Sequence, residues 1–594
     1  MLIGLWGQFM DPPMNRECLK LGLLSVAPVL AYFVYFFHFS INAPQFDDFQ
    51  SIIRAIITYD TSQNWFDWLT TQYVEHRIAY VRLVSLFIYK LTGSINFTTI
   101  SFIGNLSLVG VLVLLGLWFN RWKLLPYFLP VPVILFQMNY HQDTFTAMMA
   151  VQNLGILFWA MLTFWLLSEG RRWQQLTALL PAMAAVYTSG SGLFVVLIGI
   201  VLLLFQHRWL PLTIWLLVGT AAIGWYFRGF YWGNSLFSGS YAIHHLPQLI
   251  AFAIFFCGSY FDLLPNVLMS ECAGPNMPGY LSLVFYGRLL LPFLGGLLLI
   301  VLMAVIVLHW LLPDLYADKI RSPLAAKLAA NFSVNKSANT FLVAFLLFLL
   351  ATAFVVTLGR FGAGLGLAFA IRYKVYSPLM VIFCYAAFWV NVRPEKRINF
   401  RAMYVTVLVL SSFISLNSYY QHINQIQFDR RTALSGLFNM KVNDHWTVYG
   451  SYYGNIDSVM RVAVSKGIYQ LEQPDLPALM PVKKVDLQGK PTLSFGLDST
   501  YGYTKLYVRK SPFVMSYLTA GPDAGSYFIF YDNRKTYLLP ARLERNLIGS
   551  YRSGFSYGID HFTLDLVHSR YRVAIMTTDS NSMQFYQTTQ QLQL

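Results

Sequence analysis

The sequence predicts a polytopic α-helical membrane protein that ends in a smaller domain outside the membrane. Of its 594 residues, 56% are hydrophobic and only 12% are charged, and the mean hydropathy is +0.50. A typical soluble domain is ~45–50% apolar and ~25% charged, so this composition excludes a water-soluble globule. Apolar runs close to the ~20 residues that cross a bilayer as a helix recur along the chain. Past residue 418 the sequence becomes polar, rich in tyrosine and punctuated by glycine.

The net charge and the cysteines argue against a nucleic-acid-binding protein and against a zinc- or disulfide-stabilised one. There are 42 Lys and Arg residues against 27 Asp and Glu residues, which gives +15. In membrane proteins Lys and Arg collect in cytoplasmic loops, so we expect membrane lipids as partners and no nucleic acid. The four cysteines show no CxxC spacing, which argues against a zinc or disulfide framework. Only Cys257 and Cys272 are candidates for a pair, in an oxidising compartment.

The distribution of positive charge sets the expected topology. The first apolar run is interpreted as a retained anchor, because no small-residue cleavage site follows it. The run Ile78–Leu91 is too short to span, and placing it at the interface keeps the basic loops at 120–123, 169–172 and 207–208 together in the cytoplasm. Leu246–Leu264 is interpreted as re-entrant or interfacial for a similar reason. About eleven spans result, near 19–40, 97–119, 124–139, 144–167, 173–188, 191–206, 209–227, 284–311, 339–359, 377–391 and 402–418.

This topology divides the chain into a membrane domain, 1–418, and an outer domain, 419–594. The membrane domain has a long first outer loop at 41–96. In the outer domain, alternating or aromatic segments predict strands at Tyr527–Tyr531, Phe562–Leu566 and Tyr571–Ile575. The segment Asp457–Leu471 has a helical pattern. We therefore expect a mixed α/β or β-sandwich-like domain on the outer side of the membrane.

Adjacent carboxylates, Asp47 and Asp48, open the first outer loop between two phenylalanines. Two neighbouring anions repel, which raises the pKa of one of them unless a cation is close. A carboxylate in such a setting can act as general base toward a hydroxyl. The alternative is that one of them caps the helix expected to begin at Phe49.

Two further groups of ionisable residues fall on the outer side. The first loop closes with Glu75, His76 and Arg77, and a later loop carries His141 and Asp143. Ionisable groups near membrane depth are costly, so their default interpretation is a site with partners. Surface ion pairs are the alternative for the first group, and helix capping is the alternative for Asp143.

A cationic segment follows the ninth expected span, with Arg360, Arg372, Tyr373 and Lys374 in a glycine-rich, apolar context. Basic residues on the outer side oppose the positive-inside bias, and they suit a phosphate group whose lipid tail lies in the bilayer. Snorkelling to the interface is the alternative. In one unbroken helix Arg360 and Arg372 would point about 120° apart, so the intervening glycines have to break it.

An aromatic outer segment runs from Trp225 to Trp232 and includes Arg228 and Tyr231. Such rings stack on sugars, but they also form the ordinary interfacial belt. The turn Thr188–Gly192 is read as a tight connection between two short spans. No Walker A, GxSxG or HExxH pattern occurs, so no ATPase, serine hydrolase or zincin is indicated.

The order of these motifs resembles the GT-C superfamily of integral membrane glycosyltransferases. The likeness covers roughly 19–418: one span, a long outer loop with an acidic pair, a second acidic loop, many spans and a later arginine pair. It implies a hexosyl- or pentosyltransferase in the bacterial cytoplasmic membrane, with its active site and C-terminal domain on the periplasmic side. The donor would be a polyprenyl-phosphate sugar, transferred usually with inversion to a hydroxyl of a glycan such as lipopolysaccharide O-antigen, a lipid or a protein.

The resemblance also assigns roles by position. Asp47 is the first choice for catalytic base and Asp48 the second, and Asp143 matches the second acidic position. The residues that would orient the acceptor are Glu75, His76, Arg77, His141 and Asp143. The residues that would bind the donor phosphate are Arg360, Arg372, Tyr373 and Lys374. No cofactor is certain, and a divalent cation, Mg²⁺ or Mn²⁺, is left open with Asp47 and Asp143 as its ligands.

This chain departs from the family pattern in two respects, and other functions compete. Many relatives have Asp-Glu where this chain has Asp47-Asp48, and the resemblance does not extend over the C-terminal domain. One rival is an O-antigen polymerase or ligase with a lipid-diphosphate donor, which would rely on arginines and tolerate loss of the acids. The other rivals are a lipid or sugar transporter, which needs charged residues in mid-span, and a non-catalytic anchoring protein.

Overall fold

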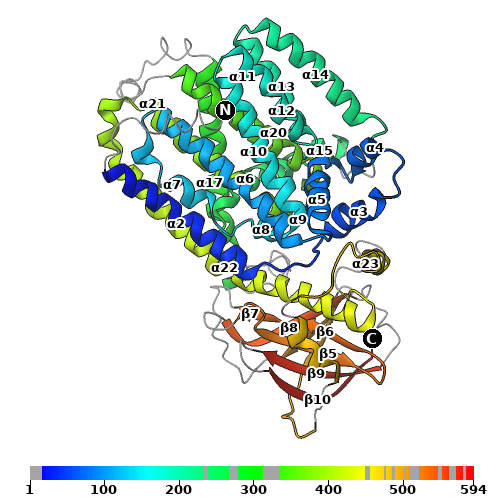
Figure 1. Ribbon diagram of the computed structural model, residues 1–594. Coiled ribbons are helices and arrows are strands. Elements are labelled where there is room, and N and C mark those ends of the chain that lie inside the picture. Colours follow the sequence, from blue (N-terminus) through cyan, green and yellow to red (C-terminus); the bar gives the residue numbers. More distant parts are fainter. Residues whose placement is uncertain are drawn as a thin grey trace.

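A computed structural model describes residues 16–232, 239–265, 279–311, 335–447, 455–473, 476–484, 488–500, 503–508, 521–545, 551–560, 570–578 and 583–593. A helical bundle forms the larger part, and a β-rich part lies below it (Figure 1). The long helix α22 (Arg401–Asn443) runs from one into the other.

Within the described residues, eight helical segments are long and apolar enough to cross a membrane. They match eight of the expected spans and include α2 (Arg16–Phe39), α6 (Phe97–Arg121), α10 (Gly155–Ser168), α14 (Trp209–Phe227), α17 (Gly279–Leu311), α20 (Lys336–Arg360), α21 (Tyr376–Asn391) and α22. The other three expected spans are shorter helices: α7 (Pro130–Leu135), α11 (Arg172–Thr177) with α12 (Leu179–Val186), and α13 (Gly192–Phe205). The structure is thus that of a polytopic membrane protein, and the full count of eleven stays a prediction.

Both runs expected at the interface are helical, as α5 (Ala79–Thr92) and α16 (Leu246–Gly258). Shorter elements connect the bundle: α3 (Arg54–Tyr59), α4 (Trp65–Thr70), η2 (Leu125–Tyr127), α15 (Gly239–His244), η4 (Ser259–Phe261) and η8 (Pro394–Phe400). The thiol of Cys257 is buried, whereas Cys272 lies outside the described residues. Their pairing therefore stays a prediction.

The basic loops after α6, α10 and α13 lie at one end of the bundle. Arg121 forms an ion pair with Glu169, and the side-chain amide of Gln206 donates to the Leu167 carbonyl at 3.3 Å. At the other end, just before α6, the Ile95 N–H donates to the Ile468 carbonyl of the β-rich part at 2.8 Å. The 25 residues of α6 measure about 37 Å along the axis, which is enough to cross a bilayer. The basic loops and the β-rich part therefore sit at opposite ends, and the cytoplasmic assignment of the basic end stays a prediction.

The β-rich part consists of two four-stranded antiparallel sheets, ordered β10-β9-β5-β6 and β3-β4-β8-β7. The strands are β3 (Gly496–Thr500), β4 (Tyr503–Val508), β5 (Gly525–Tyr531), β6 (Thr536–Pro540), β7 (Arg542–Arg545), β8 (Tyr551–Asp560), β9 (Arg570–Thr578) and β10 (Met583–Gln593). Two of the expected strands lie in β5 and β9, and Phe562–Leu566 is outside the described residues. The expected helix is α23 (Ile456–Ser465), followed by α24 (Leu476–Leu479) and η9 (Met480–Lys484).

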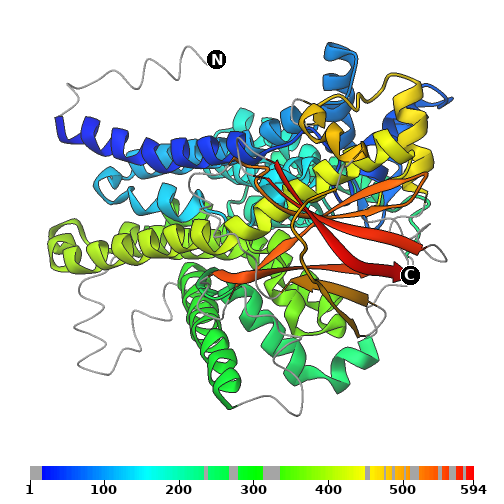
Figure 2. The same cartoon turned by 90° about the horizontal axis from the view of Figure 1, so that it is seen from below.

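The sheet β10-β9-β5-β6 lies between α22 and the second sheet. On one face of β5, Phe528 and Phe530 pack with residues of the second sheet such as Leu506. On the other face, Ile529 belongs to the core that includes Leu437 of α22. Because β5 is buried on both faces, its sequence is a continuous apolar run. In the view from below, the strands lie in front of α22 (Figure 2).

Helix α22 continues through position 418, where the composition changes. Its later turns are buried against the sheet by paired polar side chains: Asn439 exchanges hydrogen bonds of 2.8 Å with the backbone of Leu538. The Arg431 guanidinium donates to the carbonyls of Ala524 and Ala541 at 3.1 and 3.0 Å. The polarity of this stretch therefore marks contact with the sheet rather than the end of the helix.

The arrangement of the loops gives a first prediction. A cysteine placed at Lys123, at the basic end of the bundle, should react with an impermeant maleimide only after the cytoplasmic face is opened. A cysteine at Thr61, in the first outer loop, should react in intact cells. Mass spectrometry against the unsubstituted chain as blank checks both. Labelling of Lys123→Cys in intact cells would invert the topology.

Candidate functional site

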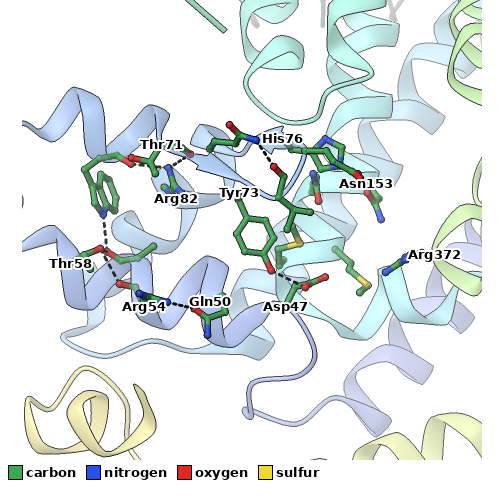
Figure 3. A pocket seen from close by; sticks show the side chains of 18 of the residues that line it. Asp47, Gln50, Arg54, Thr58, Thr71, Tyr73, His76, Arg82, Asn153 and Arg372 are labelled. Atoms are coloured by element: carbon green, nitrogen blue, oxygen red, sulfur yellow. Dashed lines mark hydrogen bonds between the residues drawn. The ribbon is translucent and has the colours of Figure 1, made fainter. Parts of the chain in front are cut away.

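A cavity of about 830 Å³ lies where the first loop meets the helices that follow residue 140 and the segment after α20 (Figure 3). Its wall contains six of the residues singled out in the sequence: Asp47, Glu75, His76, Arg360, Arg372 and Tyr373. This volume is in the range of ligand pockets. Two carboxylates of the first loop, Asp47 and Glu75, therefore share one cavity with Arg360 and Arg372.

The backbone around the cavity is irregular. Two π-helical turns contribute to its wall, η1 (Phe49–Ile53) and η3 (Ala150–Leu154), the second after α8 (His141–Phe145) and α9 (Ala147–Met149). Phe46 and Val74 have positive φ angles, 47° and 48°, which are strained for these side chains. Such turns and strained residues cluster at functional sites.

Asp47 is bound to a tyrosine from a short hairpin. The strands β1 (Gln72–Tyr73) and β2 (His76–Arg77) pair through a two-residue turn that needs a positive φ; Val74 supplies it. The Tyr73 hydroxyl donates to Oδ1 of Asp47 at 2.8 Å, and Figure 3 shows the two side chains facing each other across this bond. One carboxylate oxygen of Asp47 is thus held while the other faces the cavity.

Asp48 faces the protein interior. Its carboxylate accepts from the backbone N–H of Gln45 at 3.0 Å and of Met148, in α9, at 2.8 Å. Burial raises the pKa of Asp48 to about 7, although these N–H groups favour the charged form and Asp47 adds a smaller upward effect. Neither oxygen caps the turn that follows in sequence. Asp48 instead fixes the first loop to α9, and it does not line the cavity.

His76 lies among the charged groups of the cavity. The N–H of Gly190 donates to its Nδ1 at 3.2 Å, so this nitrogen is an acceptor. A Cβ at position 190 would lie 3.0 Å from that nitrogen, so a larger residue there would press on the His76 ring. Burial lowers the pKa of His76, with Glu75 raising it and Arg360 lowering it. The imidazole is therefore neutral near pH 7.

The chain after α20 breaks as expected from its glycines. Helix α20 ends at Arg360, Gly364 has a φ of 107°, and the short turns η5 (Phe361–Ala363), η6 (Leu365–Phe369) and η7 (Ile371–Tyr373) follow. This break brings both arginines to the cavity wall.

The two arginines differ in their partners. Arg360 forms an ion pair of 2.8 Å with Glu75 and donates to the Tyr373 hydroxyl at 3.3 Å. The guanidinium of Arg372 lies 5.2 Å from the centre of the Tyr373 ring and, within the described part of the chain, makes no hydrogen bond or ion pair. Arg372 is therefore free to bind an anion.

Lys374 points away from the cavity into a buried ion cluster. Its Nζ lies 2.8 Å from Oδ2 of Asp262. Arg288 binds the same carboxylate through Nε and a terminal nitrogen, at 3.0 and 2.9 Å. Burial disfavours the charge of Asp262, but Lys374 and Arg288 together lower its pKa to about 2. The ammonium expected to bind phosphate thus anchors the segment that presents Arg372.

Three other expected site residues also lie outside the cavity wall. Arg77 donates to the carbonyls of Tyr226 and Arg228, both at 2.5 Å, and to that of Thr70. Three of its five N–H donors are therefore bound to backbone carbonyls, and its side chain does not line the cavity.

The residues of the second acidic loop are buried behind the cavity. Asp143 accepts from Asn153, a residue of the cavity wall, at 2.7 Å. Burial raises the pKa of Asp143 well above its usual range, while Asn153 and Arg372 lower it. His141 lies against α22, with its Nε2 3.9 Å from a carboxylate oxygen of Asp429.

Within the described ranges no group of three or more His, Cys, Asp or Glu side chains is arranged to hold a metal ion. Asp47 lines the cavity and Asp143 does not, and a divalent cation between them stays a prediction.

No protein-family model, curated protein or solved structure matches the chain. The likeness to GT-C enzymes therefore stays an expectation from the sequence motifs.

Sequence reasoning missed Tyr73, Asp262 and Arg288 as parts of the site. Arg288 carried a signal, since it is a single charge within a long apolar helix, and such a charge requires a partner. Asp262 follows an apolar run, and no sequence motif around it indicates that it binds Arg288 and Lys374. The bond of Tyr73 to Asp47 depends on a hairpin geometry that the sequence does not specify.

The ion cluster gives a second prediction. Asp262→Asn leaves two buried cations without their carboxylate, and breaking a buried ion pair costs about 3–5 kcal/mol. The apparent melting temperature of the purified protein in detergent should fall sharply. Asp444→Asn is the matched control, because its ion pair with Arg461 is exposed and contributes about 0–1 kcal/mol. Equal shifts for both variants would contradict the assigned role.

Proposed function

We propose that this protein is a membrane glycosyltransferase that moves a sugar from a polyprenyl-phosphate donor to an acceptor hydroxyl. The proposal rests on one observation: Asp47 and Arg372 line the same cavity. The chemistry needs a base for the hydroxyl and a cation for the leaving phosphate, and these two residues supply them. The donor already carries its leaving group, so no nucleotide site is required.

In the proposed reaction, the free carboxylate oxygen of Asp47 accepts the proton of the acceptor hydroxyl. The hydroxyl oxygen attacks the anomeric carbon as the bond from that carbon to the phosphate oxygen breaks. The phosphate leaves with the electron pair, and Arg372 stabilises the charge that develops on it. One displacement inverts the configuration at the anomeric carbon.

The other cavity residues position these two groups. Tyr73 orients Asp47 through its hydrogen bond. The ion pair of Glu75 with Arg360 joins the hairpin to the end of α20, so it fixes the base relative to the phosphate site. His76, neutral and bound to Gly190, holds the hairpin against the α12–α13 turn.

The proposed location is the bacterial cytoplasmic membrane, with the cavity and the β-rich domain on the periplasmic side. The basic loops at the opposite end of the bundle support this orientation through the positive-inside rule. A surface glycan such as lipopolysaccharide is the acceptor class that fits an active site on that side.

A polymerase or ligase with a lipid-diphosphate donor is the second candidate. Arginines outnumber carboxylates in the cavity wall, where Arg54 and Arg82 join the two described above, and a diphosphate carries more negative charge. Arg82, however, donates to three backbone carbonyls, those of Trp68, Leu69 and Thr71. Substitution of Asp47 distinguishes the two candidates, because only the transferase requires a carboxylate base.

The third prediction concerns the base. Asp47→Asn should reduce sugar transfer by about 10²–10⁴-fold without changing the melting temperature, measured with defined polyprenyl-phosphate sugars and mass spectrometry of the product. Asp60→Asn, the same change elsewhere in the first loop, should keep wild-type transfer. Asp48→Asn should instead lower the melting temperature, because it removes a buried tie to α9. Wild-type transfer by Asp47→Asn would reject Asp47 as the base and favour a site that relies on its arginines, as in the polymerase or ligase.

The fourth prediction concerns the phosphate. Arg372→Ala should weaken the apparent affinity for the lipid donor about ten- to hundredfold, as expected for a lost charge-assisted hydrogen bond. Arg372→Lys should recover part of it, because a lysine keeps the charge but not the planar fork. Arg461→Ala, an exposed residue of the outer domain, serves as control. An unchanged donor dependence in Arg372→Ala would refute the phosphate site.

A further inference from the structure

A second pocket, of about 640 Å³, adjoins the cavity. The segment that carries Thr71, Gln72 and Val74 contributes to the walls of both. The far wall of the second pocket comes from the aromatic segment after α14, with Trp225, Arg228 and Tyr231.

Hydrogen bonds tie the two walls of this second pocket together. The side-chain amide of Gln72 accepts from the N–H of Tyr231 at 2.8 Å and donates to its carbonyl at 2.7 Å. Arg77 reaches the carbonyls of Tyr226 and Arg228 from the same hairpin. The pocket is therefore preformed, which lowers the entropic cost of binding.

The lining combines aromatic rings with free polar groups. The Tyr231 side chain is 76% exposed, and the Arg228 guanidinium lies 4.8 Å from the centre of a Trp225 ring. Within the described residues Arg228 donates no side-chain hydrogen bond, so its N–H groups are available. Asp67 accepts from Asn64 at 2.9 Å and keeps further acceptor capacity.

This combination matches the chemistry of a sugar ring. A pyranose has an apolar C–H face that packs on an aromatic ring, and its hydroxyls pair with planar groups such as guanidinium and carboxylate. The lining carries both signs of charge, Asp67 against Arg77 and Arg228, and Arg77 is bound to backbone carbonyls. A neutral ligand with several hydroxyl groups can pair with both Asp67 and Arg228. A simple interfacial belt explains neither a concave pocket nor a carboxylate within it.

We propose that the second pocket binds a neutral sugar unit of the acceptor, next to the unit whose hydroxyl reaches Asp47. The inference rests on the proposed function and extends it: the acceptor is an oligosaccharide of at least two sugar units. The shared wall lets one glycan contact Asp47 in the cavity and Tyr231 in the second pocket.

The test measures glycan binding separately from transfer. The purified full-length protein is screened against an array of neutral bacterial-surface di- to hexasaccharides, and the best binder is titrated by saturation-transfer NMR. Tyr231→Ala and Arg228→Ala should each weaken its binding at least tenfold, whereas Tyr231→Phe should retain it. Trp65→Ala, an aromatic residue that is 63% exposed but outside the lining, is the matched control.

The outcomes separate the two proposals. Binding that persists in Asp47→Asn while transfer is lost supports both. Binding in the wild type without any transfer keeps the sugar pocket and rejects the glycosyltransferase. Absence of glycan binding in the wild type, or equal binding by Tyr231→Ala, Arg228→Ala and wild type at equal melting temperatures, overturns the sugar pocket.

Discussion

A charge buried in a helical membrane protein has to be compensated by a partner, because an unpaired charge in a medium of low dielectric is very costly. Around the cavity this requirement is met in three ways. Backbone carbonyls surround Arg77, one carboxylate bridges Arg288 and Lys374, and a carboxylate at the cavity edge binds Arg360. Arg372 faces the cavity without such a partner among the described residues. An anion can therefore bind it without breaking an existing ion pair.

The β1–β2 hairpin connects this electrostatic arrangement to both pockets. Tyr73 pairs with His76, and Gln72 pairs with Arg77. Because successive side chains in a strand point to opposite faces, the first pair shares one face and the second pair shares the other. The first pair lies in the cavity with Asp47, and the second ties the hairpin to the aromatic segment after α14. One hairpin of two residues per strand thus holds Asp47 and forms part of the wall of the neighbouring pocket.

The sequence shows which ionisable side chains lie in apolar segments, where an unpaired charge costs free energy. It does not show which partner each of these side chains binds. Asp47 and Arg372 could be predicted as site residues from the sequence. Charged side chains in an apolar segment on the outer side of the membrane are costly, so they indicate a binding or catalytic role. Their neighbours Asp48 and Lys374 carry the same signal, yet they turn into the interior, since residues one or two positions apart in a turn do not face the same way. The same limit applies to α22, whose polar stretch after 418 marks burial against a sheet of distant strands.

The strained backbone on either side of the Asp47–Tyr73 bond bears on how the cavity works. Positive φ angles at Phe46 and Val74 persist only where the surroundings over-determine them. Here Asp48 fixes one strained segment to α9, and the bonds of Gln72 and His76 fix the other. Asp47, which we propose as the base, is therefore held by three separate parts of the fold. A carboxylate held in this way need not reorganise to orient a hydroxyl, which is the condition that the proposed base requires.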